Sequence, residues 1–147
     1  MSRHIMKPQP ITIHGHNEMV QAGETEQVNF EVAGKYYQMR QALYLEYQEE
    51  NAGQTVDVRI KIIPGDGMVI RRSSKELVSQ LPLLTKSENR VHYTLAEGYQ
   101  IELYAEVAQF KHEEQKPGSG RIICNYTLNH ANGAELGKYG LELKYRS

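Results

Sequence analysis

The chain has 147 residues, of which 24% are charged, and its formal net charge is −1. This length fits one domain with a sizeable core, and the near-zero net charge argues against nucleic acid or an anionic membrane as partner. The single cysteine, Cys124, excludes an intramolecular disulfide and favours a reducing, cytoplasmic location. No apolar run approaches the roughly 20 residues of a membrane-spanning helix.

Alternation of apolar and polar residues predicts strands along nearly the whole chain. Short stretches rich in Gly, Asn and Asp, such as QAGE, ENAG, PGDG and KPGSG, separate them at hairpin spacing. This pattern is typical of a β-sandwich or an up-and-down barrel, and the short connections favour an antiparallel meander closed into a barrel. We expect one β-barrel domain, 1–147, with a loose N-terminal arm at 1–9. In chain order, the clearest alternation lies at 10–16, 26–33, 41–49, 54–63, 99–107, 121–129 and 138–146.

The segment 73–84, SSKELVSQLPLL, is ambiguous. Ser73 and Glu76 form a capping-box pattern, and with Pro82 as a stop they predict a two-turn helix. Leu77, Leu81 and Leu83 share a parity, which is typical of a strand instead. The pattern alone leaves both interpretations open.

The hairpin at 57–74, DVRIKIIPGDGMVIRRSS, raises the question of which arginine faces the core. Opposed residues of an antiparallel hairpin share a face. A loop with an even number of residues would place Ile60 opposite Arg71 and turn Arg71 inward, whereas an odd loop would send Met68, Ile70 and Arg72 inward. Because two-residue loops are the commonest hairpin connection, we predict the even loop and an inward Arg71.

An inward Arg71 needs an anion or several acceptors, because an unpaired buried charge costs several kcal/mol. Glu49 has inward parity, but the predicted register places it roughly 20 Å from Arg71. A ligand anion would fill the gap, and Tyr93 and Tyr126, also inward by parity, would flank it. The alternative is that tyrosine hydroxyls, backbone carbonyls or water satisfy Arg71, or that a bulge changes its parity. The candidate ligand-binding residues are Arg71, Tyr93, Tyr126, Tyr47 and Glu49.

Other candidate sites carry weaker signals. His14 and His16 share a strand face, as metal ligands do, but their parity is opposite to that of Ile11 and Ile13, which favours solvent-facing histidines. Cys124 has core parity and is expected to be a buried, inert thiol. With no nucleophile–base pair, metal set or cofactor motif, we expect a non-enzymatic protein without a metal or cofactor.

Six short motifs occur in an order that resembles the YwiB-like family: PITIHG at 10–15, YQEEN at 47–51, VIRRS at 69–73, YTLAEG at 93–98, GRIICNYTL at 120–128 and LELKY at 141–145. This is a small bacterial family of unknown function with a calycin-type, lipocalin-like barrel. The resemblance implies an all-β barrel of about eight to ten strands and a strand at 75–84. It also implies a basic position in VIRRS, which we map onto Arg71, and it supplies no activity.

Two functions from different classes remain. The first is a binding module that holds a small apolar, anionic ligand inside the barrel. The alternative is a protein-interaction or homodimerising module with a filled barrel.

Overall fold

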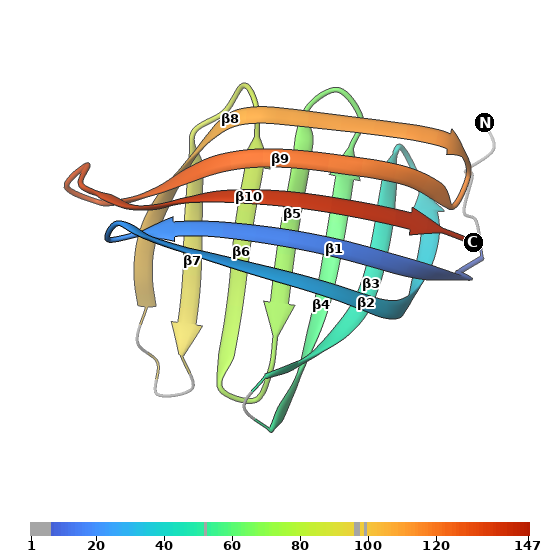
Figure 1. Cartoon of the computed structure of the whole chain (residues 1–147), viewed down its shortest axis with the longest axis horizontal. Helices are drawn as coiled ribbons and strands as arrows, with labels where there is room; N and C mark the ends of the chain where they lie inside the picture. The colour runs from blue at the N-terminus through green and yellow to red at the C-terminus, as the bar shows by residue number, and fades with distance from the viewer. Residues whose placement is uncertain (1–6, 52, 96–97, 99) are drawn as a thin grey trace.

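The chain folds into a closed barrel of ten antiparallel strands and contains no helix among the described residues (Figure 1). The computed structural model describes residues 7–51, 53–95, 98 and 100–147. The strands are β1 (Gln9–Gln21), β2 (Glu24–Met39), β3 (Ala42–Asn51), β4 (Gln54–Ile63), β5 (Gly67–Ser73), β6 (Leu77–Leu84), β7 (Asn89–Leu95), β8 (Gln100–Lys116), β9 (Ser119–His130) and β10 (Glu135–Arg146).

The barrel is flattened into two layers whose strands run across one another. Figure 1 shows β8, β9, β10, β1 and β2 in front of β3 to β7, and the far layer extends below β2. Each strand pairs with its sequence neighbour, and β1 pairs with β10 to close the barrel. The all-β barrel predicted from alternation is confirmed, with ten strands.

Inward-facing side chains from both layers fill the core, as the alternation predicts. The largest fully buried side chains are Tyr36, Ile13, Leu45, Ile60, Ile62, Met68, Leu83, Ile122, Leu143, Val58, Val91 and Cys124. Gly15 leaves room for the Phe30 ring, because a Cβ atom at this position would lie 2.1 Å from the ring. Phe30 in turn stacks on Tyr47, with ring centroids 5.9 Å apart.

The ambiguous segment at 73–84 forms strand β6. The backbone N–H groups of Glu76 and Leu77 donate to the Ser74 hydroxyl, so the serine stabilises the β5–β6 turn and starts no helix. Pro82 pairs with Val69 of β5, beyond the part of β6 that pairs with β7. Its missing N–H therefore removes no hydrogen bond between β6 and β7.

The β4–β5 loop has three residues, Pro64 to Asp66, and this corrects the predicted register. Ile63 pairs with Gly67, and Ile60 therefore opposes Ile70, where the even loop would have placed Arg71. Gly67 has φ of +137°, and a Cβ atom there would lie 2.2 Å from the Leu83 carbonyl oxygen. The Thr85 N–H and hydroxyl both donate to the Asp66 carbonyl, which holds the three-residue loop in place.

The predicted N-terminal arm, 1–9, falls mostly outside the described residues, although Gln9 already pairs with Tyr36 as part of β1. Among the residues that the structure describes, none belongs to a helix that is long and apolar enough to cross a membrane.

Candidate functional site

Arg71 lies on the outer face of β5, and the prediction that it points into the barrel is wrong. Its side chain is exposed and stands between Arg59 and Gln80 in the cross-strand register. The three-residue β4–β5 loop reverses the predicted parity of the β5 residues that follow it. The neighbouring Arg72 takes the inward position instead.

Arg72 occupies an inward row on the far layer, between Val58 of β4 and Ser79 of β6. Tyr47 lies beyond Val58 in this row, and Tyr93 lies beyond Ser79. Tyr126 projects inward from β9 in the other layer. The structure thus brings four of the five predicted ligand-binding residues around Arg72, with Arg71 excluded.

Glu49 is the charged partner of Arg72. A guanidinium nitrogen of Arg72 donates to Glu49 Oε1 at 3.4 Å, and the two side chains are 33% and 32% exposed. The β3–β4 turn places Asn51 opposite Gln54 and Glu49 opposite Val56, two residues closer to Arg72 than the sequence predicted. Such a long contact between partly exposed groups contributes about 0–1 kcal/mol.

The charges and hydroxyls of this site influence one another. Burial lowers the pKa of Arg72, but the attraction of Glu49 and their hydrogen bond more than offset it, so the pKa is raised. Burial raises the pKa of Tyr47 to about 12 and also raises the pKa of Tyr93 and Tyr126. The positive charge of Arg72 lies near all three tyrosines and lowers their pKa, which offsets part of the effect of burial. At neutral pH the site therefore holds the Arg72 cation and neutral phenols.

Most donors of this site have no acceptor. Within the described part of the chain, the Glu49 contact is the one hydrogen bond of the Arg72 side chain, and the hydroxyls of Tyr47, Tyr93 and Tyr126 have none. None of these atoms is among the buried, unpaired side-chain atoms of the described residues. On the near layer, the buried Oδ1 atom of Asn17 also lacks a partner.

Among the described residues, two inward-facing apolar side chains are half exposed. Val28 of β2 and Ile101 of β8 face inward by register, yet they are 50% and 48% exposed. Inward-facing residues elsewhere, such as Ile13 and Leu143, are fully buried. We define the Arg72 site as Arg72, Glu49, Tyr47, Tyr93 and Tyr126.

A second polar group inside the barrel was missed by sequence reasoning. Glu114 of β8 accepts hydrogen bonds from Tyr36 at 3.1 Å and from Tyr145 at 2.7 Å. The Tyr145 hydroxyl also lies 2.8 Å from His112 Nε2, and because it donates to Glu114, His112 must be the donor. A bulge between Val107 and Gln109 shifts the parity of β8, so alternation could not show that Glu114 points inward.

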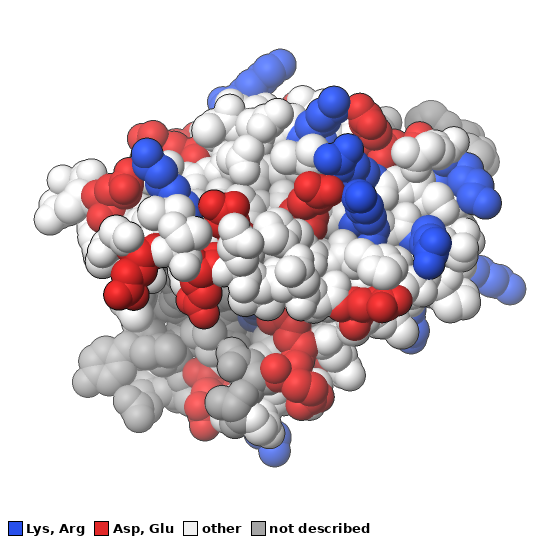
Figure 2. Space-filling view, viewed as in Figure 1, with Lys and Arg blue, Asp and Glu red and all other residues white. Residues whose placement is uncertain are grey.

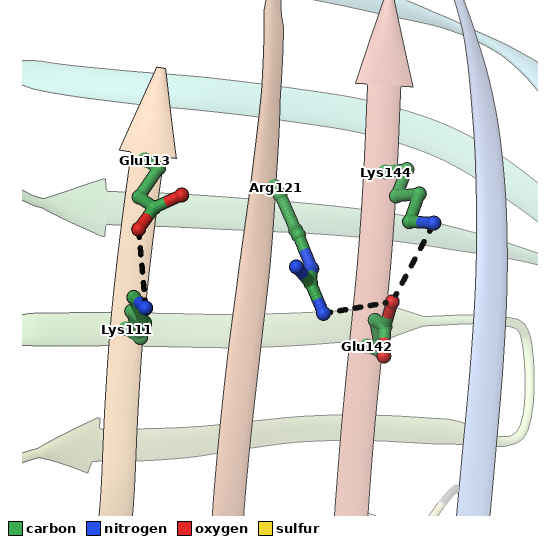
Figure 3. Close-up of polar contacts among 5 residues, drawn as sticks. All are labelled: Lys111, Glu113, Arg121, Glu142 and Lys144. Atoms are coloured by element: carbon green, nitrogen blue, oxygen red, sulfur yellow. Dashed lines mark ion pairs between the residues drawn. The ribbon is translucent and has the colours of Figure 1, made fainter.

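The outer face of β8, β9 and β10 carries solvent-exposed ion pairs. Figure 3 shows Lys111 with Glu113 at 3.2 Å, and Glu142 between Arg121 and Lys144. His14 and His16 lie on the outer face of β1, as expected, beside Glu31 and Asn29 of β2. Over the described residues, no group of three or more His, Cys, Asp or Glu residues is placed to hold a metal ion.

Cys124 is fully buried, as predicted. Burial raises the pKa of the Cys124 thiol to about 12, so the reactive thiolate is suppressed at neutral pH.

These features define the class: a small, closed, ten-stranded antiparallel β-barrel with an inward-facing arginine at one end. A family model described as "Domain of unknown function (DUF1934)" matches residues 11–143, and the chain belongs to this family. The crystal structure of the ywiB protein from Bacillus subtilis is similar, with a TM-score of 0.81 and 23% identity over 97% of this chain and 94% of that chain. This confirms the YwiB-like resemblance and the fold. Comparison with curated proteins gives no match.

Proposed function

We propose that the barrel binds a small ligand at the Arg72 site, with an anionic head group on Arg72 and an apolar body along the inward tyrosines. The proposal is for binding without a chemical step. The observation that carries it is the set of inward donors that have no acceptor among the described residues, beside partly exposed, inward-facing apolar side chains.

The weak Arg72–Glu49 contact supports the proposal, because Arg72 can exchange Glu49 for a ligand anion. At 3.4 Å and about one-third exposure, the pair contributes little to stability, so a ligand anion displaces Glu49 at small cost. Arginine offers five donors in a planar fork, which suits carboxylate, sulfonate or phosphate groups. The Tyr47 ring, stacked on Phe30, offers an aromatic surface next to this head group.

The test uses two fluorescent probes that differ in one charge. 8-Anilino-1-naphthalenesulfonate carries a sulfonate, and N-phenyl-1-naphthylamine has the same ring system without it. We expect Arg72→Leu to weaken binding of the sulfonate probe at least tenfold and to leave the neutral probe within about twofold, because only the head-group contact is lost.

Arg71→Leu is the matched control, since it removes the same charge one residue away on the outer face. It should leave both affinities unchanged. Equal weakening by Arg71→Leu and Arg72→Leu, or no saturable binding of either probe to the wild-type protein, would overturn the proposal.

The alternative was a protein-interaction or homodimerising module, and a different feature favours the protein-interaction part of it: no strand of the described residues pairs with the second edge of β2 at 24–33. The single, buried Cys124 fits the cytoplasmic location that we propose for either function.

A further inference from the structure

Strand β2 leaves its neighbour β3 halfway along its length. β2 pairs with β1 from Glu24 to Tyr36 but with β3 only from Gly34 to Met39. Figure 1 shows the two strands diverging, β2 across the near layer and β3 down the far layer. In the part of the chain that the structure describes, no strand pairs with the second edge of 24–33.

The turns reveal which backbone groups face this edge. Gln21 and Glu24 flank a two-residue turn, and such a pair exchanges both hydrogen bonds. Pairs then alternate along the ladder, so the residues of β2 that turn their N–H and C=O groups away from β1 are Thr25, Gln27, Asn29, Glu31 and Ala33. This edge thus presents a regular row of donors and acceptors.

A groove lies where β2 and β3 separate. Its volume is about 820 Å³, and its walls include 32–35 of β2 together with Glu46, Gln48 and Glu50 of β3. Three cations, Lys35, Arg59 and Arg71, also line it, together with Asp57. The groove continues the line of the free edge toward the last β2–β3 pair, Gly34 with Tyr47. An extended chain paired with β2 would have room for its end here.

The free edge lacks lysine, proline and a bulge, three of the features by which proteins block strand addition, although it carries three glutamates. Edge strands are usually short, or carry lysine, proline or a bulge. Residues 24–33, ETEQVNFEVA, contain neither lysine nor proline, and their pairing with β1 is regular. Val28, half exposed on the inward side, adds an apolar contact for an incoming strand.

The charge of this edge selects the partner. Glu24, Glu26 and Glu31 are its charged residues, and Glu18 lies beside it on β1, opposite Gln27. Figure 2 shows acidic side chains along the left and lower border of this face, while most Lys and Arg side chains lie in its right half. A second copy would bring the same acidic edge against this one, whereas a basic segment complements it.

We propose that the β2 edge, residues 24–33, binds an extended basic segment of a partner protein by β-strand addition. Backbone hydrogen bonds along the edge supply affinity, and the glutamates select lysine- and arginine-rich sequences. This interaction is separate from ligand binding at Arg72, because it uses the backbone of β2 and its acidic side chains.

The test measures fluorescence anisotropy of a labelled synthetic peptide of about nine alternating lysine and valine residues, long enough for one strand. We expect saturable binding to the wild-type protein. Gln27→Pro removes an N–H that faces the open edge and spares the β1 ladder, so it should weaken binding at least tenfold. Glu26→Lys should weaken it at least fivefold, and Glu113→Lys, the same charge change on the outer face of β8, should leave it within twofold.

Two further measurements keep the proposal falsifiable if Gln27→Pro fails to fold. A peptide of the same sequence with methylated backbone nitrogens should not bind the wild-type protein, and Arg72→Leu should bind the unmodified peptide normally. Equal binding of the methylated peptide, equal binding of a glutamate–valine peptide, or a homodimer in light scattering that the lysine peptide does not dissociate would overturn the proposal.

Discussion

Two of the polar groups inside the barrel, the Arg72 site and the Glu114 cluster of Tyr36, His112, Glu114 and Tyr145, differ in how fully their atoms are paired. Glu114 accepts hydrogen bonds from the hydroxyls of Tyr36 and Tyr145, and the Tyr145 hydroxyl also accepts one from His112. Tyr36 and Tyr145 are 0% and 2% exposed. Among the described residues, Arg72 has one side-chain hydrogen bond, to Glu49 at 3.4 Å, and both side chains of that pair are about one-third exposed. A closed network of this kind stabilises a fold, whereas free donors near solvent are available to a ligand.

Removing the carboxylate of each group should give the largest difference between them, in the free energy of unfolding. Glu114→Ala leaves the buried hydroxyls of Tyr36 and Tyr145 without an acceptor, and we expect it to lower the free energy of unfolding by about 2–4 kcal/mol. Glu49→Ala breaks one partly exposed contact and should cost less than about 1 kcal/mol. Urea unfolding followed by tyrosine fluorescence measures both values. A cost for Glu49→Ala equal to that for Glu114→Ala would make the Arg72–Glu49 pair structural.

Glu49 competes with an anionic ligand for Arg72, so weakening Glu49 should raise the affinity of the Arg72 site for an anion. Glu49→Gln removes the negative charge that occupies Arg72, so the affinity for 8-anilino-1-naphthalenesulfonate should rise about fivefold, equivalent to about 1 kcal/mol. Glu50→Gln is the control, because Glu50 faces outward and accepts a hydrogen bond from Thr55. An unchanged affinity in Glu49→Gln would show that Glu49 does not compete with the anion.

The smallest expected effect is a dependence of stability on pH at the Glu114 cluster. Burial lowers the pKa of His112, and Glu114 offsets this only in part. Below a pH of about 6.5 the unfolded chain takes up a proton at this position more readily than the folded chain, so stability is lost as pH falls through the folded pKa. His112→Gln keeps a donor for Tyr145 and should flatten the dependence between about pH 7 and pH 5. An equal slope in wild type and variant would contradict this assignment.

Much of the fold follows from alternation alone, because each strand buries one face. The inward positions of the four candidate residues Tyr47, Glu49, Tyr93 and Tyr126 were also predictable in this way. The register of β4 and β5 was not, because Met68, Val69 and Ile70 offer apolar residues to either face. Contacts distant in sequence decide it: Gly67 packs against the Leu83 carbonyl, and Thr85 holds Asp66.

The Glu114 cluster was hidden for a related reason. Val107 and Phe110 both pack against the core, three residues apart, because a bulge separates them. Counting parity along β8 from Val107 therefore assigns Glu114 to the wrong face. A single inserted residue reverses every later prediction on a strand, and sequence alternation does not locate it.

The side-chain signals of the two neighbouring arginines test the account most directly. Proton–nitrogen spectra report each arginine Nε–H group, and the signals missing from Arg72→Leu and Arg71→Leu assign the pair. On titration with 8-anilino-1-naphthalenesulfonate, the Arg72 signal should shift and saturate in step with the fluorescence, while the Arg71 signal stays in place. A saturable shift at Arg71, or bound probe with an unmoved Arg72 signal, would contradict an anion site inside the barrel.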